Sequence, residues 1–215
     1  MLKAIFWDND GVLVSTEHLY FESNRATLAK YGFNLSLEQF KEISLRQGKS
    51  VFELPGFTPP PEEAQKRIRD ERNALFSLML EKSQDKLLKC GVKDALERLS
   101  PTYAMGIVTS CRKEHFEIIH RETQILHYFR FIISEGDYPH SKPHPAPYLT
   151  ALEKSGFEAD ECVVVEDSER GLAAAAAAGI KCFVIPDALT ADGDFGRAFK
   201  VLENVSQLEG ELAKL

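Results

Sequence analysis

The stretch that decides the fold is Ala4-Ile5-Phe6-Trp7-Asp8-Asn9-Asp10-Gly11-Val12-Leu13-Val14, in which four apolar residues lead into two carboxylates and a glycine. Four consecutive apolar residues are typical of a strand that is covered on both faces, as in a parallel sheet. Side-chain direction alternates along an extended chain, so Asp8 and Asp10 share one side while Asn9 points away. Because functional groups of open α/β sheets gather at the carboxyl ends of strands, this pattern predicts a pair of carboxylates at a functional site.

An aspartate pair before a glycine also occurs in calcium-binding loops and in ordinary turns. An EF-hand loop would continue with alternating oxygen ligands and would end with a glutamate at its twelfth position. Val12, Leu13 and Val14 follow here instead, which excludes the calcium loop. Asp, Asn and Gly are poor strand residues, so their place at the end of a strand favours a functional turn.

Length and composition indicate the broad class of the protein. A chain of 215 residues is expected to form one large domain or a core with a small insertion. Its 44% hydrophobic and 27% charged residues are ordinary for a soluble globular protein, and no apolar run is long enough to cross a bilayer. Because no signal peptide is visible, we expect a cytoplasmic location. We also expect a monomer. The net charge of -7 argues against nucleic acid and anionic membranes as partners, because both require a basic face.

Other motifs that could suggest different chemistry do not hold. The triplet Gly48-Lys49-Ser50 resembles part of a nucleotide-binding P-loop, but that loop needs a glycine five residues earlier, where Ile43 stands. His140 and His144 have a helical metal-ligand spacing, yet the prolines around them prevent the helix that would align them for zinc. The cysteines lack paired ligand spacing, so we expect reduced thiols without a chemical role at Cys90, Cys111, Cys162 and Cys182.

The segment after the first strand carries helical patterns and no strand signal up to about residue 85. We expect a helix from Thr16 to Lys30, with Ser15 or Thr16 as its cap. Ser36 to Phe40 resembles another helix start, and Pro61 to Ser83 resembles a longer helix that opens with proline and two glutamates.

From about residue 92, helical and extended patterns alternate, which predicts a parallel sheet with crossover helices. Helices are expected at 92–99 and 171–179, and strands at 103–108, 129–134, 162–165 and 181–185. We therefore predict an α/β core formed by residues 1–14 and 86–215, with residues 15–85 inserted as a helical cap. Sites commonly lie at such domain interfaces.

Polar residues follow several of the predicted strands. The strand at 103–108 ends in Thr109-Ser110, another runs into Glu166-Asp167-Ser168, and Lys142 lies in a proline-held loop ahead of a helix. Each alone has an ordinary explanation, since a threonine can cap a helix, a lysine can be solvated and two acids can form a surface turn. Their joint position at strand ends, together with the first carboxylate pair, favours one site. Several acidic oxygens placed together suggest Mg²⁺.

Four segments, in this order, resemble the motifs of the haloacid dehalogenase superfamily: Asp8-Asn9-Asp10-Gly11-Val12-Leu13, Ile107-Val108-Thr109-Ser110, Lys142-Pro143 and Glu166-Asp167-Ser168-Glu169-Arg170-Gly171. Within it, the chain is similar to the β-phosphoglucomutase-like and phosphoglycolate phosphatase-like branch, which has a small helical cap after the first motif. The resemblance implies a Rossmann-like core, a Mg²⁺ cofactor and hydrolysis of a small phosphorylated metabolite.

The resemblance also implies a role for each matching residue. Asp8 would attack the phosphoryl group to form an aspartyl phosphate, and Asp10 would act as general acid and base. The phosphate-binding residues would be Thr109, Ser110 and Lys142. The metal ligands would be Asp8, Asp10 through its backbone carbonyl, and Asp167, with Glu166 as a further ligand or a support through water. This division agrees with the chemistry, because covalent capture splits a slow hydrolysis into two steps.

Alternatives within and outside the superfamily differ at particular positions. The dehalogenases lack the second aspartate and the phosphonate-cleaving relatives have alanine there, so Asp10 argues against both. The β-phosphoglucomutase branch carries histidine where this chain has Tyr20. This difference argues against a phosphomutase but does not exclude it, so a phosphomutase is kept as the alternative. A phosphoacceptor signalling domain places its acceptor on a later strand. A non-catalytic binding protein on the same fold is also possible, because fold alone does not fix function.

The predicted cap is expected to select the substrate. We expect Tyr20, Arg46 and Lys49 to contact the part of the substrate that does not react, because binding energy from remote groups can close a lid and exclude water. The alternative for the two cations is a pair of solvated surface charges. Phosphosugars, phosphoglycolate-like compounds and nucleotides all remain open as substrates.

Overall fold

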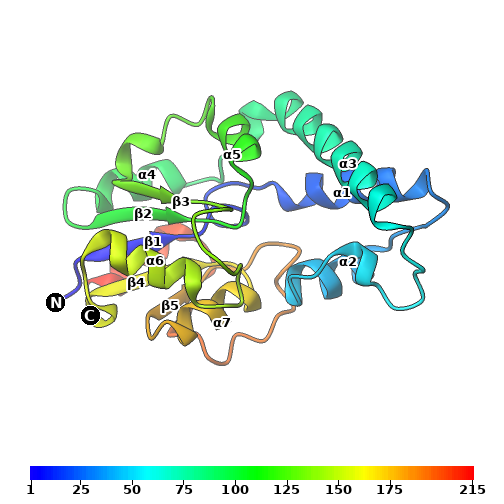
Figure 1. The fold of residues 1–215 in the computed structure, drawn as a ribbon. Coiled ribbons are helices and arrows are strands. Elements are labelled where there is room, and N and C mark those ends of the chain that lie inside the picture. Colours follow the sequence, from blue (N-terminus) through cyan, green and yellow to red (C-terminus); the bar gives the residue numbers. More distant parts are fainter.

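Six parallel strands form the centre of the protein, in the order β3-β2-β1-β4-β5-β6 (Figure 1). The structure is a computed structural model that describes the fold of residues 1–215 and every side chain except that of residue 85. The strands are β1 (Ala4–Trp7), β2 (Ala104–Val108), β3 (Phe131–Ile133), β4 (Cys162–Glu166), β5 (Lys181–Val184) and β6 (Lys200–Val201). Every neighbouring pair is parallel, which confirms the predicted α/β class and places β1 inside the sheet.

Helices cover both faces of this Rossmann-like sheet (Figure 1). The α-helices are α1 (Glu17–Ala29), α2 (Leu37–Phe40), α3 (Glu62–Lys82), α4 (Val92–Leu99), α5 (Lys113–His120), α6 (Ala146–Ser155), α7 (Glu169–Ala177) and α8 (Leu208–Leu212). Because side chains alternate along a strand, Ile5 and Trp7 of β1 pack with α4, α5 and α8, whereas Ala4 and Phe6 pack with α6 and α7. All four residues are buried, as a strand covered on both faces requires.

Helices α1, α2 and α3 lie beyond one end of the sheet, between β1 and β2 in the chain (Figure 1). Ser36 starts α2 with a capping box, and the chain continues as a π-helical segment, η1 (Lys41–Arg46). A cluster of buried apolar side chains packs these helices together and includes Leu28, Phe40 and Ile68. The other end of α3 packs against the sheet cluster instead. The boundaries of a separate cap at residues 15 and 85 stay a prediction.

The chain passes between the sheet and these helices twice, and the two crossings are hydrogen-bonded to each other. The backbone N–H of Ser15 donates to the carbonyl of Leu87 (2.8 Å), and the N–H of Lys89 donates to the carbonyl of Leu13 (3.0 Å). The crossings therefore form a short antiparallel pair. The Lys89 ammonium group adds two further contacts, one to the carbonyl of Gly11 and one to a carboxylate oxygen of Asp187 (2.6 Å).

The predicted strands and helices are present, with differences of a few residues at their ends. Strand β6 was not predicted, because it has only two residues and both are exposed. Thr16 precedes α1, but its side chain forms no cap hydrogen bond. Thr16 is therefore the N-cap residue, one of the two predicted, but its hydroxyl donates to Asp10 and not to the helix. Among the described residues, no helix is both long and apolar enough to cross a membrane.

Candidate active site

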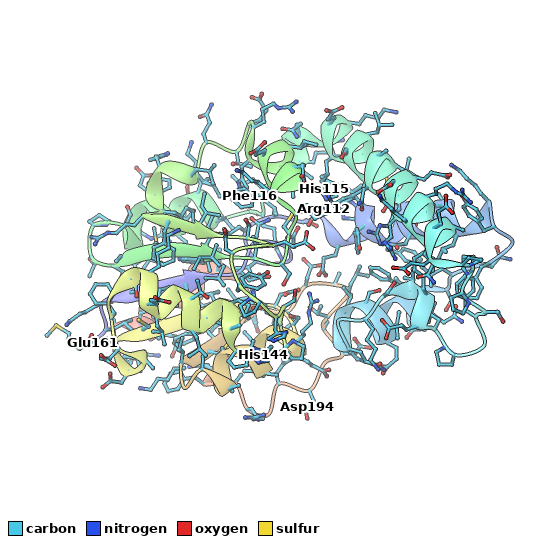
Figure 2. All side chains as sticks on the ribbon, viewed as in Figure 1. Arg112, His115, Phe116, His144, Glu161 and Asp194 are labelled. Atoms are coloured by element: carbon cyan, nitrogen blue, oxygen red, sulfur yellow. The ribbon has the colours of Figure 1, made fainter. Side chains whose placement is uncertain are left out.

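The carboxyl ends of the strands face α1 and α3 across a cavity of about 250 Å³. A cavity of this size can hold a small metabolite. Most of the residues that the sequence singles out line it, namely Asp8, Asp10, Tyr20, Lys49, Thr109, Ser110, Lys142, Glu166 and Asp167. Arg112 and His115, at the start of α5, also line it and lie where the sheet meets α3 (Figure 2). The structure therefore brings together segments that are far apart in the sequence.

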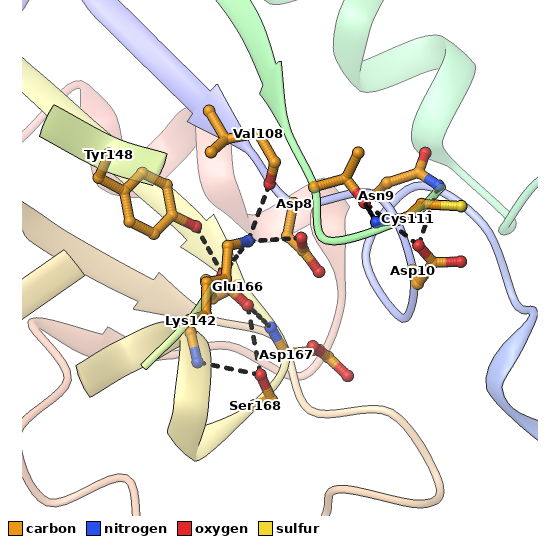
Figure 3. Close-up of polar contacts among 12 residues, drawn as sticks. Asp8, Asn9, Asp10, Val108, Cys111, Lys142, Tyr148, Glu166, Asp167 and Ser168 are labelled. Carbon is orange, nitrogen blue, oxygen red and sulfur yellow. Dashed lines mark hydrogen bonds and ion pairs between the residues drawn. The ribbon is translucent and has the colours of Figure 1, made fainter. Parts of the chain in front are cut away.

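Lys142 holds the centre of the acidic group (Figure 3). Its ammonium nitrogen lies 2.6 Å from Oδ1 of Asp8, 2.7 Å from Oε1 of Glu166 and 2.8 Å from the carbonyl oxygen of Val108. An ammonium group has three donors, so these contacts fix its position. Burial opposes the charged form of Lys142, which is 3% exposed, but Asp8 and Glu166 outweigh this effect and raise its pKa. The lysine therefore stays positively charged beside both acids.

Glu166 serves as the anchor for Lys142, since hydrogen bonds occupy both of its carboxylate oxygens (Figure 3). Oε1 also accepts from the hydroxyl of Tyr148 (2.5 Å), and Oε2 accepts from the backbone N–H of Asp167 (3.3 Å) and from the hydroxyl of Ser168 (3.4 Å). Gly171 packs so closely against this carboxylate that a Cβ there would overlap it. The role of Tyr148 could not be seen in the sequence, because nothing in the pattern of α6 indicates a hydrogen bond to the end of β4.

Asp10 is held by different donors from Asp8. The hydroxyl of Thr16 donates to its Oδ1, while the side-chain amide of Asn9 (3.2 Å) and the hydroxyl of Thr109 (3.4 Å) donate to its Oδ2. Asn9 is fully buried and its side-chain oxygen faces away from the cavity. The alternation predicted from the sequence therefore holds, because both aspartates line the cavity while the asparagine between them does not.

Thr109 and Ser110 follow β2 directly. The hydroxyl oxygen of Thr109 accepts from the backbone N–H of Cys111 (2.9 Å), which orients the turn after the strand. The hydroxyl of Ser110 is buried and has no hydrogen-bond partner among the described residues. A buried hydroxyl without a partner is costly, so a polar ligand in the cavity would satisfy it.

A group of three carboxylates could hold a metal ion. Ligand oxygens of Asp8, Glu166 and Asp167 all lie within 4.8 Å of one another. Burial raises the pKa of Asp8 and Glu166 adds to this effect, while Lys142 opposes it; burial together with Glu17 raises the pKa of Asp167. The site thus concentrates more negative charge than one ammonium group balances. A divalent cation with oxygen ligands fits this excess.

The donor set favours two of the three acids as direct ligands. Both oxygens of Glu166 already accept hydrogen bonds, whereas Asp167 accepts only from the hydroxyl of Thr190 (3.3 Å) among the described side chains. Gly11, at a φ of +84°, lets the loop after β1 approach Asp167 so closely that any Cβ would collide with its carboxylate. The structure thus supports Asp8 and Asp167 as ligands better than Glu166.

Two charged residues of the cavity were not singled out from the sequence. Glu17, in the first turn of α1, has a raised pKa because it is buried and lies near Asp10. Arg170, at the start of α7, also lines the cavity. One oxygen of Glu17 and Nε of Arg170 are buried and have no hydrogen-bond partner among the described residues. An acid at a helix start is common, so the sequence carried no signal for Glu17.

Two of the three residues predicted to contact the substrate from the cap line the cavity. Tyr20 lines the cavity, and the guanidinium of Arg72 lies 5.2 Å from its ring centre. Lys49 also lines the cavity and is exposed. Arg46 does not line it, because its guanidinium pairs with Glu42 (3.1 Å) and Asp192 (3.0 Å). The structure thus places Arg46 outside the lining of the cavity, and a contact between Arg46 and the substrate stays a prediction; Arg72 is a further cation at the cavity.

Comparison with known proteins identifies the family. The family model described as haloacid dehalogenase-like hydrolase matches residues 5–185. The phosphorylated carbohydrates phosphatase of Thermotoga maritima is 31% identical over 186 residues, which cover 84% of this chain and 83% of the relative.

Solved structures agree on the fold. CbbY from Rhodobacter sphaeroides has crystal structures with phosphate and, as a mutant, with xylulose-(1,5)bisphosphate. Both superpose with a TM-score of 0.83 at 24% identity, over 97% of this chain and 96% of theirs. The β-phosphoglucomutase of Clostridium difficile gives 0.83 at 20% identity, over 100% of this chain and 96% of that one. With a family model that spans most of its length, this chain belongs to the haloacid dehalogenase-like hydrolases.

Proposed function

We propose that this protein is a Mg²⁺-dependent phosphatase that hydrolyses a small phosphorylated carbohydrate through an aspartyl phosphate on Asp8. The observation that carries the proposal is the position of Asp8. Lys142 anchors one oxygen of its carboxylate, while the other has no hydrogen-bond donor among the described residues and the side chain lines the cavity. A carboxylate held in this way can attack a phosphoryl group from a fixed direction.

The two aspartates divide the chemistry. In the first step, an oxygen of Asp8 forms a bond to phosphorus, the ester bond breaks, and Asp10 gives its proton to the leaving oxygen. In the second step, water attacks the phosphorus and returns a proton to Asp10. The bond between Asp8 and phosphorus then breaks, which releases phosphate and restores both acids. The separate donors around Asp10 support this division, because they orient it independently of Asp8.

The remaining residues stabilise charge on the transferring group. Ser110 offers a hydroxyl without a protein partner, Thr109 orients the turn that presents it, and Lys142 supplies a fixed positive charge beside Asp8. Asp8 and Asp167 would hold Mg²⁺, together with the backbone carbonyl of Asp10. When bound, the ion supplies positive charge that reduces repulsion between the acids and the phosphoryl oxygens.

The substrate class is supported by the relatives and by charge in the cavity. The relative from Thermotoga maritima is named a phosphatase of phosphorylated carbohydrates, and the CbbY structure contains a sugar bisphosphate. Besides Lys142, four cations from separate segments line the cavity: Lys49, Arg72, Arg112 and Arg170. They would offset the negative charge of a phosphosugar in a chain whose net charge is -7. A phosphomutase is the second candidate, favoured by the fold shared with β-phosphoglucomutase.

A panel of phosphorylated sugars, assayed for phosphate release with Mg²⁺, tests this proposal. Asp8→Asn should lose turnover by at least about a hundredfold and keep its circular dichroism spectrum, because the amide is a poor nucleophile. The matched control is Asp160→Asn, which changes an exposed aspartate just before the start of β4, at the opposite end of the strand from Glu166. Rapid acid quenching with a ³²P-labelled substrate should trap a phosphoenzyme that hydroxylamine cleaves, as expected of an acyl phosphate.

Several outcomes would contradict the proposal. If Asp8→Asn turned over substrate as fast as the control, Asp8 would be excluded as the nucleophile. Conversion of a sugar phosphate to its isomer without phosphate release would favour the mutase. Chelation followed by metal-free activity would exclude Mg²⁺, and so would a melting temperature that added Mg²⁺ does not raise, because an ion that binds the native site must stabilise the fold.

A further inference from the structure

A buried chain of hydrogen bonds leads away from Asp10 into the protein interior. The side-chain nitrogen of Asn9 lies 3.2 Å from Oδ2 of Asp10, and its side-chain oxygen lies 2.7 Å from Nε2 of His120. The other ring nitrogen of His120 lies 2.9 Å from the hydroxyl of Thr123. Asn9, His120 and Thr123 are all buried, and none of the three lines the cavity.

The direction of each hydrogen bond follows from the chemistry of the groups. Burial lowers the pKa of His120 to about 4, so the ring is neutral near pH 7 and carries one proton. A side-chain amide oxygen can only accept, so the proton of His120 must be on Nε2. Nδ1 is then an acceptor and takes the hydroxyl proton of Thr123. Every donor in the chain therefore points toward Asp10.

The orientation of the Asn9 amide follows from Asp10. If the amide were flipped, its oxygen would face the carboxylate of Asp10, and two acceptors would oppose each other. The amide nitrogen is therefore the end that meets Asp10, and the buried amide oxygen needs a donor, because an unmade hydrogen bond in a buried site is costly. Nε2–H of His120 supplies this donor, so the histidine completes the hydrogen bonds that hold the amide in place.

We propose that His120 is a positioning residue that acts through Asn9 to hold the carboxyl group of Asp10 in the plane required for proton transfer. The inference rests on the proposed function and extends it to residues outside the cavity. The hydroxyl of Thr16 holds Oδ1 of Asp10, and the hydroxyl of Thr109 makes a long contact of 3.4 Å to Oδ2. The Asn9 amide supplies the shorter bond on Oδ2 (3.2 Å), and bonds on both oxygens fix the plane.

Packing alone does not explain a histidine at this position. His120 is the last residue of α5, and its ring packs against that of Phe116, with the ring centroids 4.4 Å apart. A leucine could fill an apolar site of this kind without desolvating two ring nitrogens. Buried polar chains persist where every member is satisfied, and this one ends on the proposed proton donor.

The test compares His120→Leu, His120→Gln and Ile119→Val, the last being a core variant of the same helix whose side chain has no polar atom and packs in the sheet cluster. Each is assayed on aryl phosphates whose phenols differ in pKa. His120→Leu should lower kcat by about tenfold for the least acidic phenols, with KM unchanged, because proton transfer matters most for poor leaving groups. His120→Gln, whose amide can donate to Asn9, should recover most of the loss. Ile119→Val should lose little for any substrate.

A second measurement is independent of turnover. In the ¹⁵N spectrum of the wild-type imidazoles, His120 should be the neutral Nε2–H form at pH 7. If His120→Leu fails to fold, Thr123→Val replaces it, because it removes the donor to Nδ1 and leaves the ring in place. An Nδ1–H or charged ring, equal losses for all phenols, or equal losses in His120→Leu and Ile119→Val would each overturn the inference alone. An inactive wild-type protein would overturn the proposed function, and the inference with it.

Discussion

The contacts of Lys142 show how one residue can organise a site built from acids. Its ammonium group neutralises parts of two carboxylates that would otherwise repel each other in a buried place. Removing one member of such a group leaves an uncompensated buried charge, which costs more than the intact arrangement gains. The anchoring of Glu166 by Tyr148 therefore matters for Asp8 as well, because both acids share the same ammonium group.

At the same scale, His120 should make stability depend on pH. Burial lowers its pKa from 6.5 to about 4, so the unfolded chain takes up a proton before the folded protein does as the pH falls. This contribution to stability is complete above pH 6.5 and is lost between 6.5 and 4. Linkage at about 1.4 kcal/mol per pKa unit gives a loss of up to about 3 kcal/mol.

Urea unfolding of the wild type and His120→Gln at pH 7, 5.5 and 4.5 measures this loss. The free energy of unfolding of the variant should fall less between pH 7 and 4.5, because its side chain does not titrate. His18→Gln, which changes an exposed histidine, controls for the loss of an imidazole. Parallel curves for the wild type and His120→Gln would show that the ring is not buried in its neutral form.

At the scale of the element, helix α7 depends on the glycine in its first turn. A Cβ on Gly171 would overlap the carboxylate of Glu166, so Gly171→Ala should displace Glu166 and, through it, Lys142. We expect a loss of stability of about 1–3 kcal/mol and a larger loss of kcat than of substrate affinity. Gly210→Ala is the matched control, because that glycine is also helical and no atom lies within 4 Å of its added Cβ.

The control should be neutral or stabilising, since alanine favours a helix over glycine by roughly 1 kcal/mol. Melting temperatures and steady-state kinetics of the two variants provide the comparison. If Gly171→Ala and Gly210→Ala have the same melting temperature and the same kinetic constants, the close approach of α7 to Glu166 is not needed for stability or activity.

The elements that could be predicted from the sequence are those with a strong local pattern. The continuous apolar runs of β1 and β4 and the capping residue Ser36 stand out along the chain, and the structure places these elements where expected. Strand β6 has two exposed residues and no pattern of its own, so only its pairing with β5 defines it. Thr16 has the right residue type for a cap, but a stronger acceptor, Asp10, takes its hydroxyl.

The same distinction applies to the site. Residues in the loops after strands could be anticipated, because parallel strands bring their carboxyl ends together. The contacts of Tyr148 and His120 could not, since each depends on how helices pack against the sheet. The ion pairs of Arg46 could not be anticipated either, because the sequence does not reveal that Glu42 and Asp192 both lie within reach of its guanidinium.

At the scale of the whole molecule, ion pairs join η1 to the loop after β5. Asp192 lies 2.8 Å from Lys41 and 3.0 Å from Arg46, on the opposite side of the boundary between sheet and helices. Exposed pairs of this kind contribute little, so Asp192→Asn should lower kcat/KM by no more than about fivefold at low salt. Added salt should remove the difference, because it screens exposed charges.

The control for this prediction is Glu22→Gln, which breaks an exposed pair with Arg25 inside α1 and crosses no boundary. Steady-state kinetics across a series of ionic strengths would compare the two variants with the wild type. If Asp192→Asn and Glu22→Gln have the same salt dependence, the pairs to Asp192 do not hold η1 against the sheet.

The paired crossings at Ser15 and Leu87 have a consequence for how such a molecule can change. The two ends of the α1–α3 segment are hydrogen-bonded to each other, so the segment begins and ends at the same place on the sheet. The segment could therefore be exchanged without a change in the order or the connections of the strands. A graft of another helical segment would have to match the spacing of these two crossings, the apolar side chains of α3 that pack on the sheet, and the contacts of η1 with Asp192. The acids at the strand ends would remain in place. The helical segment could then be replaced between related proteins while the sheet with its acids is kept as one unit.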